Sequence, residues 1–99
     1  MNPIFNDRIT FTVGQAAELL DVRQAFLRRL EAHDLVRPER SGGNQRRYNH
    51  GDLERVSHIC DLVGDGLTLN GVRRVLELEA EVRMLKAEIK RLKARDARR

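Results

Sequence analysis

Apolar residues recur at helical spacing in the first third of this chain. In residues 12–20 and again in residues 22–31 they fall on one face of a helix, at intervals of three and four. Thr12 is a suitable N-cap for the first helix, and Gln15 completes a capping box. Asp21 stands between the helices, where a left-handed backbone is expected. The apolar faces are Val13, Ala16, Ala17 and Leu20, followed by Val22, Phe26, Leu27 and Leu30.

The pattern breaks after the second helix. Asp34 is expected to end that helix, and Leu35–Val36 to return to the core. Pro38 and the Gly42–Gly43 pair interrupt any regular element, so residues 37–48 are predicted to form a small β-wing. Before the first helix, residues 9–11 are either a short strand or an extended lead-in, and residues 1–9 a flexible arm.

Two further helices follow the wing. Asn49 is expected to cap the first of them, with Asp52 near its positive end. Residues 64–66 end this helix, and Thr68 caps a long fourth helix that begins at Leu69. The apolar stripe of the third helix is Leu53, Val56, Ile59, Cys60 and Val63.

The fourth helix carries a heptad pattern, with apolar residues alternating at spacings of three and four. Two and a half heptads need a partner helix, so a second copy of the chain is predicted to pair with this seam. The alternative is a helix that folds back on its own domain. The predicted bounds are 10–77 for the winged helix-turn-helix domain, 78–95 for the coiled coil and 96–99 for a basic tail. The predicted dimerisation residues are Val75, Leu78, Val82, Leu85, Ile89 and Leu92.

Composition narrows the functions open to the chain. It has 99 residues, a net charge of +4 and one cysteine, which excludes an internal disulfide and a cysteine-cluster metal site. The three histidines lack ligands at metal-binding spacing, and no nucleophile–base pair is apparent. We therefore expect no cofactor, no metal and no enzymatic activity. With no membrane-spanning run and no signal-peptide core, the expected location is cytoplasmic, on the nucleoid.

Arginines concentrate on the second helix and the wing, where few carboxylates accompany them. A helix-turn-helix places one helix in the major groove, and a basic loop beside it can contact the flanking backbone. Arg28 is expected to contact the DNA backbone, and the alternative is an ion pair with Glu31. Tyr48 is expected to meet a phosphate through its hydroxyl, and the alternative is packing alone. Two or three of the four wing arginines are expected to touch DNA. The predicted DNA-binding residues are Thr12, Arg23, Gln24, Ala25, Arg28, Arg29, Arg37, Arg40, Arg46, Arg47 and Tyr48.

These elements together resemble the MerR family of bacterial transcription regulators over roughly residues 10–92. Residues 13–17 resemble its first helix, and Leu27–Arg28 with Glu31 fit its Thr-Leu-Arg-Tyr-Tyr-Glu signature. Residues 35–38 fit the Gly-Leu-Leu-x-Pro motif that follows, residues 46–48 fit the end of the wing, and residues 66–69 fit the start of the fourth helix. The chain departs from the family pattern at three places. Phe26 replaces the usual Thr, Arg29–Leu30 replaces the usual Tyr pair, and Asp34 replaces the usual Gly. Within the family, residues 42–43, 46–48 and 69–79 look closest to the HspR-like heat-shock repressor subgroup.

The resemblance implies a mainly α fold: a winged helix-turn-helix DNA-binding domain followed by a coiled-coil dimerisation helix, with no effector domain. It implies a sequence-specific regulator that binds a pseudo-palindromic promoter site in double-stranded DNA as an antiparallel homodimer, with repression favoured over activation. One alternative is an architectural or excisionase-like recombination protein. Another is a coiled-coil adaptor that recruits RNA polymerase or a chaperone.

Overall fold

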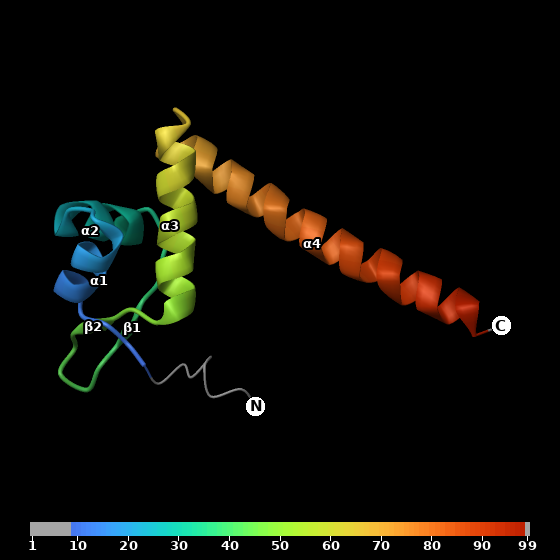
Figure 1. Ribbon diagram of the computed structural model, residues 1–99, viewed down its shortest axis with the longest axis horizontal. Helices are drawn as coiled ribbons and strands as arrows, with labels where there is room; N and C mark the ends of the chain where they lie inside the picture. Colours follow the sequence, from blue (N-terminus) through green and yellow to red (C-terminus); the bar gives the residue numbers. More distant parts are fainter. Residues whose placement is uncertain (1–8, 99) are drawn as a thin grey trace. The chain divides into compact units, whose positions relative to one another are not determined.

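The structure of the protein is a computed structural model that describes residues 9–98 (Figure 1). It is mainly helical, as predicted. Its contacts divide it into two units, one ending at Gly66 and the other beginning at Leu67. The elements are α1 (Val13–Leu20), α2 (Gln24–Ala32), β1 (Glu39–Arg40), β2 (Arg46–Arg47), α3 (His50–Gly64) and α4 (Leu69–Ala97).

The ends of α1 follow the local signals in the sequence. The Thr12 hydroxyl accepts a hydrogen bond from the Gln15 amide (3.1 Å), and the Gln15 side chain accepts one from the Thr12 amide (2.9 Å). This is the predicted capping box. Asp21 ends the helix in a left-handed conformation, with φ 54°. The turn that orients α2 is therefore fixed within a few residues.

Helix α2 begins at Gln24, inside the predicted segment 22–31, because Arg23 is its N-cap. Leu27 and Leu30 are fully buried, whereas Val22 and Phe26 are only half-buried. The buried face of α2 is therefore narrower than the predicted one. Asp34 follows the helix with φ 58°, and the Leu35 amide then donates to the Leu30 carbonyl (2.9 Å). Leu35 and its neighbour Val36 enter the core, as predicted.

The core of the first unit lies where α1 packs against α2 and α3. Ala16 and Ala17 are buried at this contact, and their small side chains let the helices approach closely. Figure 1 shows α1 and α2 together on one side of α3, with the wing beyond the start of α3. The other buried side chains of this unit are Leu27, Leu30, Leu35, Val36, Tyr48, Val56 and Ile59.

The wing is a two-stranded antiparallel ribbon in which Glu39 faces Arg47, and Arg40 faces Arg46. At its tip the Ser41 amide donates to the Gln45 carbonyl (2.8 Å), and Asn44 takes the left-handed conformation with φ 64°. Phe11 forms a β-bridge with Tyr48, so the segment before α1 is extended. Of the predicted arm, residues 1–8 lie outside the described residues.

Helix α3 begins with a second capping box. The Asn49 side chain accepts from the Asp52 amide (2.7 Å), and the Asp52 carboxylate accepts from the Asn49 amide (2.9 Å). Val56 and Ile59 are buried, and Leu53 and Cys60 half-buried. Val63 is exposed, so the predicted stripe leaves the core at its C-terminal end. Gly66, with φ 97°, turns the chain after the helix.

The second unit is the single helix α4. The Thr68 hydroxyl caps it by accepting from the Gly71 amide (3.1 Å). The helix continues without a break through residue 78 and ends at Ala97. The domain bounds inferred from the sequence stay a prediction. None of the helices described is both long and apolar enough to cross a membrane.

Candidate nucleic-acid interface

Burial of Leu27 and Leu30 leaves the opposite side of α2 facing outward. The residues on that side are all exposed, as predicted. Near the start of the helix, the Gln24 side-chain oxygen accepts a hydrogen bond from Arg28 (3.2 Å). A Cβ on Gly14 of α1 would lie 3.4 Å from the Gln24 side-chain nitrogen, so Gly14 is next to this side chain. The exposed residues are Arg23, Gln24, Ala25, Arg28 and Arg29.

Glu31 joins α2 to both strands of the wing. One carboxylate oxygen pairs with Arg40 at 3.1 Å, and the other accepts a hydrogen bond from the Arg46 Nε. That bond is the main reason why the pKa of Arg46 is raised, because the carboxylate stabilises the charged guanidinium. Arg40 also donates to the Asn44 carbonyl (3.3 Å) at the wing tip. We call Glu31, Arg40 and Arg46 the wing cluster.

Arg47 points away from the wing cluster, because neighbouring strand residues alternate between faces. Its Nε donates to the Thr10 hydroxyl (3.0 Å) in the segment before α1. Arg37 precedes the wing and is more exposed, and its only ion pair within residues 9–98 is a loose one with Asp34 (3.7 Å). The four wing arginines thus have three different surroundings. Thr12, also predicted to contact DNA, is half-buried and uses its hydroxyl to cap α1.

The position of Tyr48 does not fit the predicted contact of its hydroxyl with DNA. It is 0% exposed, and its hydroxyl is buried with no hydrogen-bond partner among the described residues. Burial raises its pKa, and the charge of Glu31 adds to the shift. A buried hydroxyl does not reach a phosphate. The structure therefore favours packing over DNA contact for Tyr48.

The sequence offered an ion pair with Glu31 as the alternative to DNA contact for Arg28. The structure pairs Arg28 with Gln24 instead, since the Glu31 carboxylate is taken by Arg40 and Arg46. Glu31 itself was missed as a site residue. A signal was present in the sequence, because Glu31 is one of only three carboxylates in the arginine-rich window from residue 23 to residue 47.

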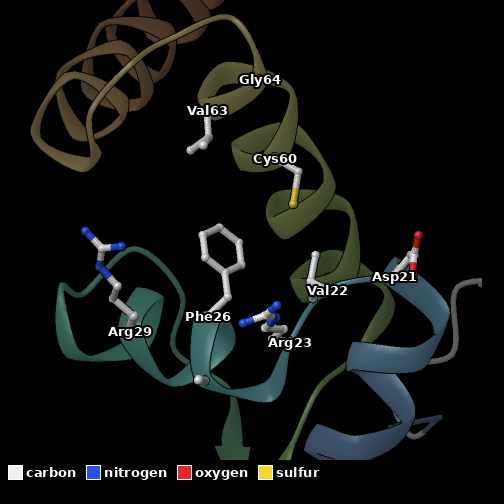
Figure 2. Close-up of a pocket in the computed structure, with 9 residues that line it drawn as sticks. Asp21, Val22, Arg23, Phe26, Arg29, Cys60, Val63 and Gly64 are labelled. Carbon is white, nitrogen blue, oxygen red and sulfur yellow. The ribbon is translucent and has the colours of Figure 1, made fainter.

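A hollow lies beside α2, between its first turns and the end of α3. Figure 2 shows Phe26 lying between Arg23 and Arg29 and facing Cys60 and Val63. Burial raises the pKa of the Cys60 thiol above its ordinary value, with a smaller effect from the charge of Asp61, so the thiol stays protonated at neutral pH. Across residues 9–98 no group of three or more His, Cys, Asp or Glu side chains has the arrangement of a metal site.

Comparison with known proteins places these features in a family. Residues 11–79 match the model of the MerR HTH family of regulatory proteins. A Streptomyces coelicolor protein named for the heat shock protein HspR is 34% identical over 89 residues, which cover 89% of this chain and 59% of that protein. The HTH-type transcriptional regulator GlnR of Bacillus anthracis is 31% identical over 91 residues, covering 89% of this chain and 70% of GlnR.

Two solved structures share the fold. The crystal structure of HiNmlR, a MerR family regulator lacking the sensor domain, was determined bound to promoter DNA. It aligns with a TM-score of 0.68 and 23% identity over 90% of this chain and 74% of its own. A MerR family transcriptional regulator from Bacillus cereus aligns with a TM-score of 0.66 and 21% identity over 91% of this chain and 72% of its own.

Proposed function

This chain belongs to the MerR family of helix-turn-helix regulatory proteins, and on that premise we propose that it is a sequence-specific, DNA-binding transcriptional regulator that acts as a homodimer. The observation that carries the proposal is the exposed polar face of α2 beside an arginine-rich wing. Its similarity to HTH-type regulators supports a regulatory rather than an enzymatic role. The protein would act on double-stranded DNA in the cytoplasm.

We assign base recognition to the start of α2. Arg23 and Gln24 are exposed at its first turn, and this end of the second helix contacts base edges in helix-turn-helix complexes. Arg pairs well with guanine and Gln with adenine, and each such contact discriminates by about 1–3 kcal/mol. Ala25 is next to them and is small enough to allow close approach to the groove. The start of α2 would therefore determine the sequence that is read.

We assign backbone contact to the arginines further along α2 and on the wing. Arg28 and Arg29 are exposed, as is Arg37 before the wing. Arg47 is half-buried, and its Nε donates to the Thr10 hydroxyl. Each phosphate that such a side chain neutralises releases counterions, which makes binding strongly salt-dependent. These contacts would supply affinity and orientation rather than sequence preference.

The apolar seam of α4 supports a homodimer. Leu78, Val82, Leu85, Ile89 and Leu92 are 42%, 47%, 59%, 51% and 43% exposed. Such a row of apolar side chains along one helix is suited to pairing with a second helix. The simplest partner is α4 of a second copy, antiparallel as the family resemblance implies. A dimer would then bind two half-sites of a pseudo-palindromic promoter.

Repression is the regulatory outcome that we favour, on the resemblance to the heat-shock repressor subgroup. The alternatives are a recombination accessory protein and an adaptor that recruits RNA polymerase or a chaperone. The heptad seam favours a regulator over the first of these, because a dimerising helix suits a two-fold operator. Exposure of the α2 face argues against the second, since an adaptor needs no arginine-rich groove-binding surface.

Selection of bound duplexes from a random pool tests the proposal directly. We expect a pseudo-palindromic consensus, and genome-wide mapping should then place that sequence at promoters. Peaks at recombination attachment sites would instead support the accessory role. An intact dimer that selects no sequence at moderate salt would favour the adaptor. Arg23→Ala should relax the preference at one position of each half-site, whereas Arg73→Ala on α4 should leave the consensus unchanged.

A further inference from the structure

Arg40 and Arg46 face each other across the two strands of the wing. Like charges directly opposite in an antiparallel pair destabilise it. Glu31 offsets this repulsion, because its Oε1 pairs with Arg40 and its Oε2 pairs with Arg46. A single carboxylate thus binds both arginines of a cross-strand pair and offsets one of their two positive charges. It comes from a different element, the last turn of α2.

The wing cluster connects three parts of the first unit. Glu31 belongs to α2, Arg40 to β1 and Arg46 to β2. Arg40 extends the connection to the wing tip through the Asn44 carbonyl. The side chains of Glu31, Arg46 and Arg40 are 22%, 32% and 42% exposed, so the cluster is partly sheltered from solvent. A shared, partly sheltered network of charges is more effective than an isolated surface pair.

We propose that Glu31 is a positioning residue for DNA recognition: it fixes the wing against α2, so that the wing lies at a defined distance from the base-reading end of that helix. The proposal rests on the DNA-binding function above. Arg40 and Arg46 then serve mainly to hold the wing. The wing arginines left for phosphates are Arg37 and Arg47, which lie outside the cluster.

Positioning of this kind affects specific and non-specific binding differently. A specific complex needs α2 in the groove and the wing on the flanking backbone at the same time. If the wing must be ordered on binding, the cost of ordering it reduces the affinity. A non-specific complex requires only that positive charge lie near phosphates. Loss of Glu31 should therefore reduce the ratio of specific to non-specific affinity.

Glu31→Gln tests the proposal, with Glu39→Gln as the matched control. Both remove one negative charge from the same region, but Glu39 lies outside the wing cluster. Affinities for the selected duplex and for a scrambled duplex are measured at several salt concentrations. Relative to Glu39→Gln, we expect Glu31→Gln to bind the selected duplex about fivefold more weakly, with little change for the scrambled one.

Amide exchange in the absence of DNA gives a second measurement. The wing amides of Ser41 and Asn44, which are hydrogen-bonded at the tip, should exchange faster in Glu31→Gln than in Glu39→Gln. The amides within α1 and α3 should keep their protection. A loss of protection throughout the first unit would show a general loss of stability and would overturn a positioning role.

Two results with DNA would also overturn it. Equal specificity ratios for the two variants would mean that Glu31 does not position the wing. Tighter binding of Glu31→Gln to both duplexes, with a steeper salt dependence, would show that Glu31 competes with phosphate for Arg40 and Arg46. Failure of the proposed function is distinguishable from either result, because the unmodified protein would then select no sequence.

Discussion

Phe11 and Tyr48 exchange a pair of backbone hydrogen bonds, at 2.7 and 2.8 Å, which join the segment before α1 to the end of the wing. The Phe11 ring also makes an edge contact with His50, the first residue of α3, at a centroid distance of 5.5 Å. The Tyr48 side chain is completely buried. This junction therefore contributes to the core as well as to the base of the wing.

Tyr48→Phe should leave the stability of the protein unchanged or raise it by about 1 kcal/mol. The hydroxyl is buried without a partner among the described residues, and a buried unpaired polar group is costly. Tyr48→Ala should lower the stability by about 3–5 kcal/mol, because it leaves a cavity. Urea unfolding measures both. Weaker DNA binding by Tyr48→Phe at unchanged stability would contradict the packing role and restore the phosphate contact.

The same side chain predicts a dependence on alkaline pH. Burial raises the pKa of Tyr48 in the folded protein above its ordinary value of 10.0. The folded state then holds this proton more tightly than the unfolded state, so the stabilisation is complete below pH 10 and is lost as the pH rises further. The unfolding free energy should fall more steeply above pH 10 than that of Tyr48→Phe. Parallel curves for the two proteins would contradict the raised pKa.

Asp34→Gly should stabilise the protein by about 1 kcal/mol, because Asp34 has a φ of 58° and glycine adopts this conformation without a Cβ clash. The ion pair that the substitution removes, with Arg37, is long and exposed, and contributes little. Asp34→Ala removes the same pair but keeps the clash, so it should destabilise. Thermal unfolding of the two variants separates backbone strain from charge. If both variants changed the melting temperature equally, the change would come from loss of the ion pair and not from the backbone.

Arg47→Ala and Arg46→Ala should affect DNA binding in different ways, although the residues are neighbours. Loss of Arg47 should lower the slope of log affinity against log salt by about 1, for any duplex. Loss of Arg46, which is paired with Glu31, should change this slope less and should reduce specificity more. Titrations at four salt concentrations measure both quantities. The same change of slope in both variants would show that Arg46 also contacts phosphate.

The starts of α1, α3 and α4 were predictable from the sequence because their signals are local. Thr12, Asn49 and Thr68 all cap the helices that the sequence assigned to them. Asp21 takes the left-handed conformation expected of it. Each of these features depends on residues no more than four positions away, so no tertiary information was needed.

The wing cluster depends on information that is not local. The pairing of Glu31 with Arg40 and Arg46 requires the register of the wing and the direction in which α2 faces it. Tyr48 is buried where its backbone bridges to Phe11, on a segment distant in the chain. The sequence identified the wing arginines as a group, but it did not separate Arg40 and Arg46, which pair with Glu31, from Arg37 and Arg47, which do not.

Leu85→Asp should convert the protein to a monomer, because Leu85 lies at the middle of the α4 seam and a carboxylate there would be buried in the predicted helix pair. Met84→Asp is the matched control. Met84 is the adjacent residue and is 73% exposed, but it is not a member of the heptad seam. Sedimentation should give a monomer for the first variant and a dimer for the second, with both retaining helical circular dichroism from the first unit. The monomer should lose cooperative binding to the two half-sites while keeping weak binding to one. A dimer that persists in Leu85→Asp would show that another surface joins the two copies and that the seam is misassigned.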